Sequence, residues 1–104
     1  MPDGIVVKKG FNINTVRYTK QGTAAADTDI MIPYSTILTN VGVSLTDAIA
    51  IYVEGIRPTS SWGEVRPSPP FFLISGGEGN LGFHNFGTGG NYVMDIIVMY
   101  RDYS

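Results

Sequence analysis

The chain of 104 residues contains no cysteine and has few charged residues. The absence of cysteine excludes a disulfide scaffold, a thiolate zinc site, an iron–sulfur cluster and a thiol nucleophile. Charged residues make up 15% of the chain, against about 25% in an average soluble domain. The seven basic residues are scattered, so no basic stripe can neutralise phosphates. We therefore expect no nucleic-acid partner.

The sequence also has little that would enter a membrane. Residues 1–10 carry an acid before two lysines and an apolar stretch of only three residues, which does not make a signal peptide. The longest uncharged run, Ile30 to Thr46, contains Pro33, Gly42 and many hydroxyl groups, so it cannot span a bilayer. We expect neither membrane insertion nor export.

Long helical patterns are absent as well, because no stretch of ten or more residues repeats apolar side chains at i, i+3, i+4 and i+7. The apolar residues are mostly isoleucine, valine, phenylalanine and tyrosine, which favour sheets. We predict one all-β domain over residues 1–104, an antiparallel β-sandwich or jelly roll of about eight short strands. The predicted strands run from Gly4 to Lys9, Phe11 to Thr19, Thr28 to Pro33, Ser35 to Asn40, Ala48 to Arg57, Phe71 to Ser75, Asn80 to Phe86 and Asn91 to Arg101.

The fifth predicted strand has a clear sidedness. Alternation assigns Ile49, Ile51 and Val53 to the core and the residues between them to the other face. Ahead of this strand, Ser44 and Asp47 form a capping pattern that favours a single helical turn.

The last predicted strand is apolar on both faces. One face carries Tyr92, Met94, Ile96, Val98 and Tyr100. The other carries Val93, Ile97 and Met99, with Asp95 as a lone charge to be paired or hydrated. Since no helices are predicted to cover the second face, we expect another subunit to bury Val93, Ile97 and Met99. The alternative is cover by the proline-rich loop from Arg57 to Pro70.

Three glycines raise the question of a cofactor. Gly77, Gly79 and Gly82 spell G-x-G-x-x-G after a predicted strand. A dinucleotide site requires a helix that opens at the third glycine, but the residues that follow predict a strand and a turn. We interpret the glycines as hairpin residues and expect no cofactor.

The titratable residues give no catalytic pattern. His84 is the only histidine, and a half-buried strand position is the favoured interpretation over catalysis. Asp27 and Asp29 could ligate calcium, but two carboxylates are too few ligands, so solvated turn residues are the preferred interpretation. No serine-hydrolase, phosphate-loop or zinc-protease motif occurs. We expect neither an enzyme nor a metal site.

Aromatic residues form the remaining candidate for binding. Trp62 lies in the proline-rich loop, and alternation puts His84 and Phe86 on the face opposite to Phe83. With Tyr92, the residues Trp62, His84 and Phe86 are candidates for contact with a sugar ring or a protein partner. The alternative is that these rings fill a small core.

The sequence resembles small virion proteins of tailed bacteriophages over most of its length. The features that carry the resemblance are a short N-terminal Met-Pro-Asp-Gly-Ile-Val-Val strand, few charges, glycine-rich hairpins at Ser75 to Asn80 and Gly87 to Asn91, and a two-faced terminal strand that ends Val98-Met99-Tyr100-Arg101. The resemblance implies a β-sandwich or jelly roll, commonly trimeric, at a tail tip, a fibre end or a capsid surface.

The leading hypothesis is therefore an oligomeric structural protein of a phage tail tip or tail fibre, with a trimer favoured. It would be made in the host cytoplasm, reside in the virion, bind other virion proteins and contribute to attachment to a host-surface glycan or protein. Two alternatives stay open: a carbohydrate-binding, lectin-like module that uses the aromatic surface, and a capsid decoration protein.

Overall fold

The computed structural model describes residues 10–61, 63–75 and 77–103, which form six strands and one helix. The elements are β1 (Asn12–Ala25), β2 (Thr28–Pro33), α1 (Tyr34–Val41), β3 (Ala48–Pro58), β4 (Phe71–Ser75), β5 (Glu78–Asn85) and β6 (Gly89–Asp102). β2 and β4 have the predicted bounds. The strand predicted from Gly4 to Lys9 lies outside the described residues.

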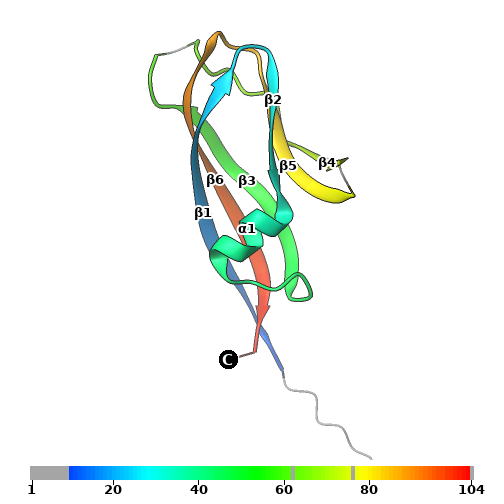
Figure 1. The fold of residues 1–104 in the computed structure, drawn as a ribbon. Coiled ribbons are helices and arrows are strands. Elements are labelled where there is room, and N and C mark those ends of the chain that lie inside the picture. The colour runs from blue at the N-terminus through cyan, green and yellow to red at the C-terminus, as the bar shows by residue number, and fades with distance from the viewer. Residues whose placement is uncertain (1–9, 62, 76, 104) are drawn as a thin grey trace, which may run out of the picture.

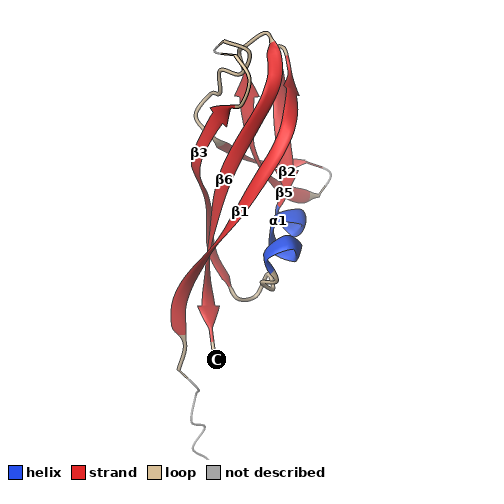
Figure 2. Ribbon diagram, turned by 90° about the vertical axis from the view of Figure 1, so that its left-hand side faces the viewer, coloured by secondary structure: helices blue, strands red, loops and turns tan. Residues whose placement is uncertain are grey.

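The strands make two antiparallel three-stranded sheets that stack face to face (Figure 1). Sheet A has the order β1-β6-β3 and sheet B the order β2-β5-β4. Only the connection from β4 to β5 stays within one sheet, so the chain passes repeatedly between the layers. The predicted all-β sandwich is confirmed. Figure 2 shows that the lower ends of β1 and β6 extend past α1 and sheet B.

The segment from Ser35 to Asn40, which we predicted as a strand, is part of the helix α1 instead. Its apolar residues Tyr34, Ile37, Leu38 and Val41 follow i, i+3, i+4 and i+7 spacing. Eight residues are too few for a stable isolated helix, but burial of Ile37 and Leu38 stabilises this one. The part of the chain that the structure describes contains no candidate membrane-spanning helix.

The boundaries of α1 follow from backbone constraints. Pro33 precedes the first turn with an extended conformation, and Gly42 ends the helix in the left-handed region at φ 74°. Beyond it the predicted helical turn is present, because the N–H of Ala48 donates to the carbonyl of Ser44 over 3.2 Å. The hydroxyl of Ser44 also donates to the carboxylate of Asp47 over 3.0 Å.

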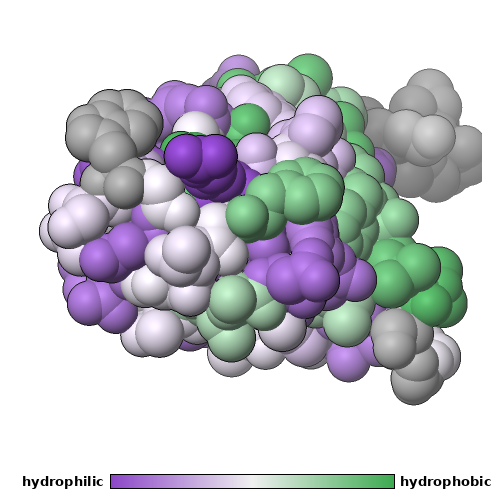
Figure 3. Space-filling model, turned by 90° about the horizontal axis from the view of Figure 1, so that it is seen from above, coloured by the Kyte–Doolittle hydropathy of each residue, from purple (hydrophilic) through white to green (hydrophobic). Residues whose placement is uncertain are grey.

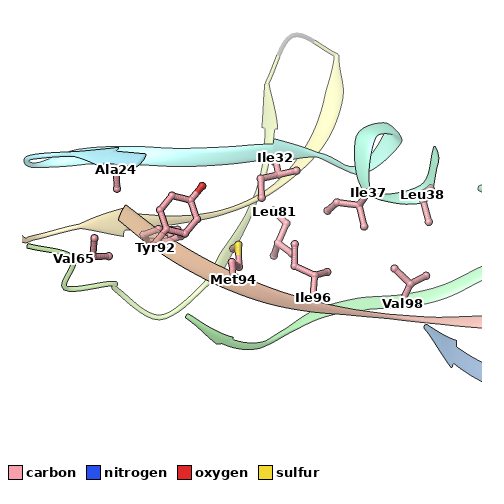
Figure 4. Packing of buried hydrophobic residues seen from close by; sticks show 11 residues of the cluster. Ala24, Ile32, Ile37, Leu38, Val65, Leu81, Tyr92, Met94, Ile96 and Val98 are labelled. Carbon is pink, nitrogen blue, oxygen red and sulfur yellow. The ribbon is translucent and has the colours of Figure 1, made fainter. Parts of the chain in front are cut away.

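The core lies between β6 and the elements stacked on it. In Figure 4, Ile37 of α1 and Ile32 of β2 point toward the row of β6 side chains that includes Met94 and Ile96. The predicted inward face of β6 is thus confirmed. The buried hydrophobic cluster consists of Ala24, Ile32, Ile37, Leu38, Val65, Leu81, Phe83, Tyr92, Met94, Ile96 and Val98.

One core assignment in β3 was wrong. Ile51 and Val53 pack against the core as predicted, but Ile49 is 44% exposed. The register shifts between Ala48 and Ala50, so Ile49 is an extra residue in a β-bulge and the alternation changes phase there. Ala48 takes the core-facing position in its place.

Candidate functional site

His84 lies on the outer face of β5, between two carboxylates. Asp29 of β2 is its direct cross-strand partner, and the His84 Nδ1 and Asp29 Oδ1 atoms are 2.7 Å apart. Asp27 approaches from the β1–β2 connection, with 2.8 Å between His84 Nε2 and Asp27 Oδ1. Asp27 adopts a φ of 52°, a left-handed conformation that aspartate tolerates in turns.

The two carboxylates favour protonation of the imidazole. Hydrogen bonds to the carboxylate of Asp29, and then to that of Asp27, raise the pKa of His84 above its usual value. In the protonated ring both nitrogens donate, one to each carboxylate, so this arrangement favours the cationic form of His84.

Both aspartates are solvated as predicted, with 88% of the Asp27 side chain and 52% of the Asp29 side chain exposed, and Asp27 lies in a turn. Asp29 lies in the strand β2 and not in a turn, and each carboxylate also contacts a ring nitrogen of His84. The two carboxylates lie against different nitrogens of the ring, so they do not converge on one point. Among the described residues, no group of three or more histidine, aspartate or glutamate side chains is arranged to hold a metal ion.

The predicted aromatic contact residues do not all reach the surface. The rings of His84 and Phe86 are adjacent, with centroids 4.5 Å apart, and Phe86 is 66% exposed. Tyr92, in contrast, is 2% exposed and packs edge-on against Phe83 in the core. The position of Tyr92 therefore gives no support to its predicted contact with a sugar or a protein partner. Trp62 lies outside the described residues.

Asn85, the inward-facing neighbour of His84, was missed as an organising residue. It is completely buried, and its Oδ1 accepts from the backbone N–H groups of Arg66 at 2.9 Å and Gly87 at 2.8 Å. Its Nδ2 donates to the carbonyls of Ala25 at 3.0 Å and Glu64 at 3.3 Å. A polar residue on a core face was the available signal, since alternation places Asn85 beside Phe83.

On the upper part of the outer face of sheet A, side chains of the same sheet cover the apolar residues of β6. Val93 and Ile97, two of the predicted subunit-interface residues, are each 7% exposed in the single chain. The lone charge Asp95 is paired, as predicted: Arg57 Nη1 lies 2.9 Å from one carboxylate oxygen and Thr19 donates to the other over 2.8 Å. Val93 and Ile97 thus offer little further area to a partner.

Farther along sheet A, a salt bridge joins the flanking strands across β6. Arg17 Nη2 of β1 lies 2.7 Å from Glu54 Oε1 of β3. Arg17 and Tyr52 are the cross-strand neighbours of Ile97, so long side chains from both sides contribute to its cover.

The two faces of sheet A change in character at its lower end. The face that forms the core farther up carries the polar residues Asn12, Asn14 and Asp102 beside Tyr100, and Asn14 donates to Asp102 over 2.6 Å. The outer face carries Ile13 and Met99 together with Thr15 and Arg101. We define the lower outer patch as Phe11, Ile13, Met99 and Tyr103.

Residues of the lower outer patch are solvent-exposed in the single chain. Phe11 is 48%, Ile13 59% and Tyr103 38% exposed, while Met99, the third predicted interface residue, is partly buried. The rings of Phe11 and Tyr103 have centroids 5.5 Å apart, and the Arg101 guanidinium lies 5.9 Å from the centre of the Phe11 ring. The patch is therefore an exposed apolar surface that also contains the cationic Arg101 side chain, the cross-strand partner of Ile13.

Comparisons with protein-family models, curated protein sequences and solved structures return no match to this chain.

Proposed function

We propose that this chain is a structural subunit that assembles with other copies of itself through the outer face of sheet A, without catalysis. The observation that carries the proposal is the group of exposed large apolar side chains on the outside at the lower end of the sheet, Phe11, Ile13 and Tyr103. A free monomer gains nothing from this arrangement. Burial in a subunit interface would stabilise the assembly by roughly 1 kcal/mol for each half-exposed large side chain such as Ile13.

The lower outer patch extends the surface that the two-faced terminal strand predicted. Met99 belongs to both, and Tyr52 of β3, 43% exposed, continues the patch toward Ile97. The interface we propose is therefore shifted toward the lower end of the sheet, away from Val93 and the paired Asp95.

The setting we propose is a tail tip or tail fibre of a bacteriophage. The resemblance of the sequence to small virion proteins supports this setting, with a trimer as the favoured state and other virion proteins as further partners. A capsid decoration protein would use the same kind of subunit contact, so the alternative stays open.

Replacement of Ile13 by lysine tests the proposed contact. Ile13→Lys adds a charge to the lower outer patch, so sedimentation should show loss of the wild-type oligomer with an unchanged circular dichroism spectrum. Asn12→Lys is the matched control, because Asn12 is the preceding exposed residue and lies on the opposite face. Equal effects of the two variants, or none from Ile13→Lys, would contradict the proposal.

Attachment to a glycan is a second candidate function, favoured by the exposed ring of Phe86 beside His84. An exposed aromatic face with neighbouring carboxylates, here Asp27 and Asp29, offers stacking and hydroxyl acceptors to a sugar. Phe86→Ala should abolish any binding seen on a glycan array, while Phe11→Ala, at the other end of the molecule, should not. Unchanged binding by Phe86→Ala would exclude this surface.

A further inference from the structure

β4 is an edge strand whose core-facing side chains are uncovered. Phe72 pairs in register with the buried Leu81, and Ile74 lies two residues along, so both are on the face that forms the core elsewhere in sheet B. Yet Phe72 is 57% and Ile74 is 74% exposed. Figure 1 shows the reason: the hairpin of β4 and β5 projects beyond the side of sheet A.

The sandwich is open between this hairpin and β3. An apolar hollow of about 210 Å³ lies there, with Tyr34, Leu45, Ile49 and Phe72 among its lining residues. Leu45 is 74% exposed, and the rings of Tyr34 and Phe72 have centroids 5.9 Å apart. From above, apolar surface gathers on the right-hand side, where Figure 1 places the hairpin (Figure 3).

β4 also lacks the features that protect free strand edges, which are charges, prolines and bulges. β1 carries Arg17 and Lys20, β2 carries Asp29 and ends at Pro33, and β3 has two register shifts. β4 has the sequence FFLIS and an unbroken register with β5. Of the four edge strands, β4 is therefore the one best suited to pair with a strand of another molecule.

The unpaired backbone groups of β4 belong to two residues. Ser75 pairs with Glu78, so the connection between β4 and β5 has two residues. In such a hairpin the pair nearest the turn exchanges hydrogen bonds, and the pattern then alternates along the ladder. The N–H and C=O groups of Phe72 and Ile74 therefore point away from β5, toward the free edge.

We propose that β4 pairs antiparallel with β4 of a second copy of this chain, about a two-fold axis at Leu73. In this register Phe72 of each copy lies opposite Ile74 of the other, and their free backbone groups form hydrogen bonds across the axis. The result is a continuous six-stranded sheet.

The side chains and charges agree with this register. Phe72 and Ile74 of the two copies meet on the inner face, while each Leu73, 44% exposed, faces its own counterpart on the outer face. No charged residue lies within β4, so the two-fold axis sets no like charges against each other. A second copy is therefore a complementary occupant for this edge.

The area indicates a reversible contact. The exposed parts of Phe72, Leu73 and Ile74 amount to roughly 300 Å² per copy, so pairing buries on the order of 600 Å² of side-chain surface, below the ~1,000 Å² of a stable interface. The contact is separate from the lower outer patch and does not depend on it. The two surfaces together would let copies join in two directions.

Cysteine cross-linking tests the register, because the natural chain has no cysteine. At a non-hydrogen-bonded antiparallel pair the Cα atoms are about 4.5 Å apart, within the roughly 4.4 to 6.8 Å that a disulfide spans. Leu73→Cys should form a covalent dimer rapidly under mild oxidation. Thr88→Cys, also exposed but distant from β4 in the chain, should not. Equal rates for the two variants would overturn the proposal.

Opposite charges at the axis provide an independent test. Leu73→Lys and Leu73→Glu should each weaken association at least about tenfold, since each sets like charges face to face. An equimolar mixture should restore it. Pairing through β4 would be overturned if the mixture did not restore association. It would also be overturned if the Leu73 variants associated normally and removal of residues 1–9 abolished association. An effect of Ile13→Lys without any of Leu73→Lys would leave the proposed function standing.

Discussion

Asn85 and His84 are neighbours on β5 that face opposite sides of sheet B and bond different parts of the chain. Asn85 joins the end of β1, the 64–66 segment and Gly87 from inside, whereas His84 joins β2 and the β1–β2 connection from outside. Alternation predicted their faces correctly. It could not predict the contact with Asp29, which depends on the register of β2 against β5.

Loss of the Asn85 amide should be costly. Asn85→Ala would leave the buried N–H of Gly87 and the part-buried N–H of Arg66 without their acceptor, so we expect a loss of about 3 kcal/mol in the free energy of unfolding, measured with urea. Asn40→Ala, an exposed asparagine on α1 with one backbone contact, is the control and should cost far less. Similar costs for both would contradict the role of Asn85.

The pKa of His84 should respond to both aspartates, with the larger effect from Asp29. Asp29→Asn should lower the pKa of His84 more than Asp27→Asn, as followed by NMR of the imidazole, because the Asp29 hydrogen bond is the largest cause of the raised pKa. A raised pKa in the folded state stabilises it below the ordinary histidine pKa, and this contribution is lost as the pH rises through the raised value. A larger effect of Asp27→Asn would contradict this order.

At the scale of elements, local pattern predicted strands well where nothing interrupted it. β2 and β4 have the predicted bounds. The segment of α1 was predicted as a strand because we required at least ten residues for a helix. Its apolar residues at i, i+3, i+4 and i+7 nevertheless form a short helix, which packing of Ile37 and Leu38 in the core stabilises. The bulge at Ile49 reversed one core assignment for a similar reason. The short helix and the bulge both depend on the elements that pack or pair with them, and these elements are distant in the sequence.

The connection from β5 to β6 passes so close to the 63–64 segment that it requires glycine at one position. A Cβ atom at Gly87 would lie 2.3 Å from the carbonyl oxygen of Glu64, so the backbone would have to move. Gly87→Ala should lower the thermal unfolding midpoint substantially. Gly55→Ala, where nothing lies within 4 Å of the added Cβ, should change it little. Equal shifts would contradict the close approach.

At the scale of the whole molecule, the sandwich exposes large apolar side chains in two places. Composition and the two-faced β6 predict that neighbouring subunits complete the fold, and we propose that these two surfaces make the contacts. One is the lower outer patch, and the other is the free edge of β4. Neither could be located from sequence, since both depend on where sheet B and α1 stop covering sheet A.

The molar mass of the purified wild-type chain in solution tests the central claim most directly. Sedimentation equilibrium over a wide range of concentration should give a mass that is a multiple of 11.3 kDa and that rises further as the concentration increases. A mass of 11.3 kDa at every concentration, with the chain folded, would contradict the account of this protein as an assembling subunit.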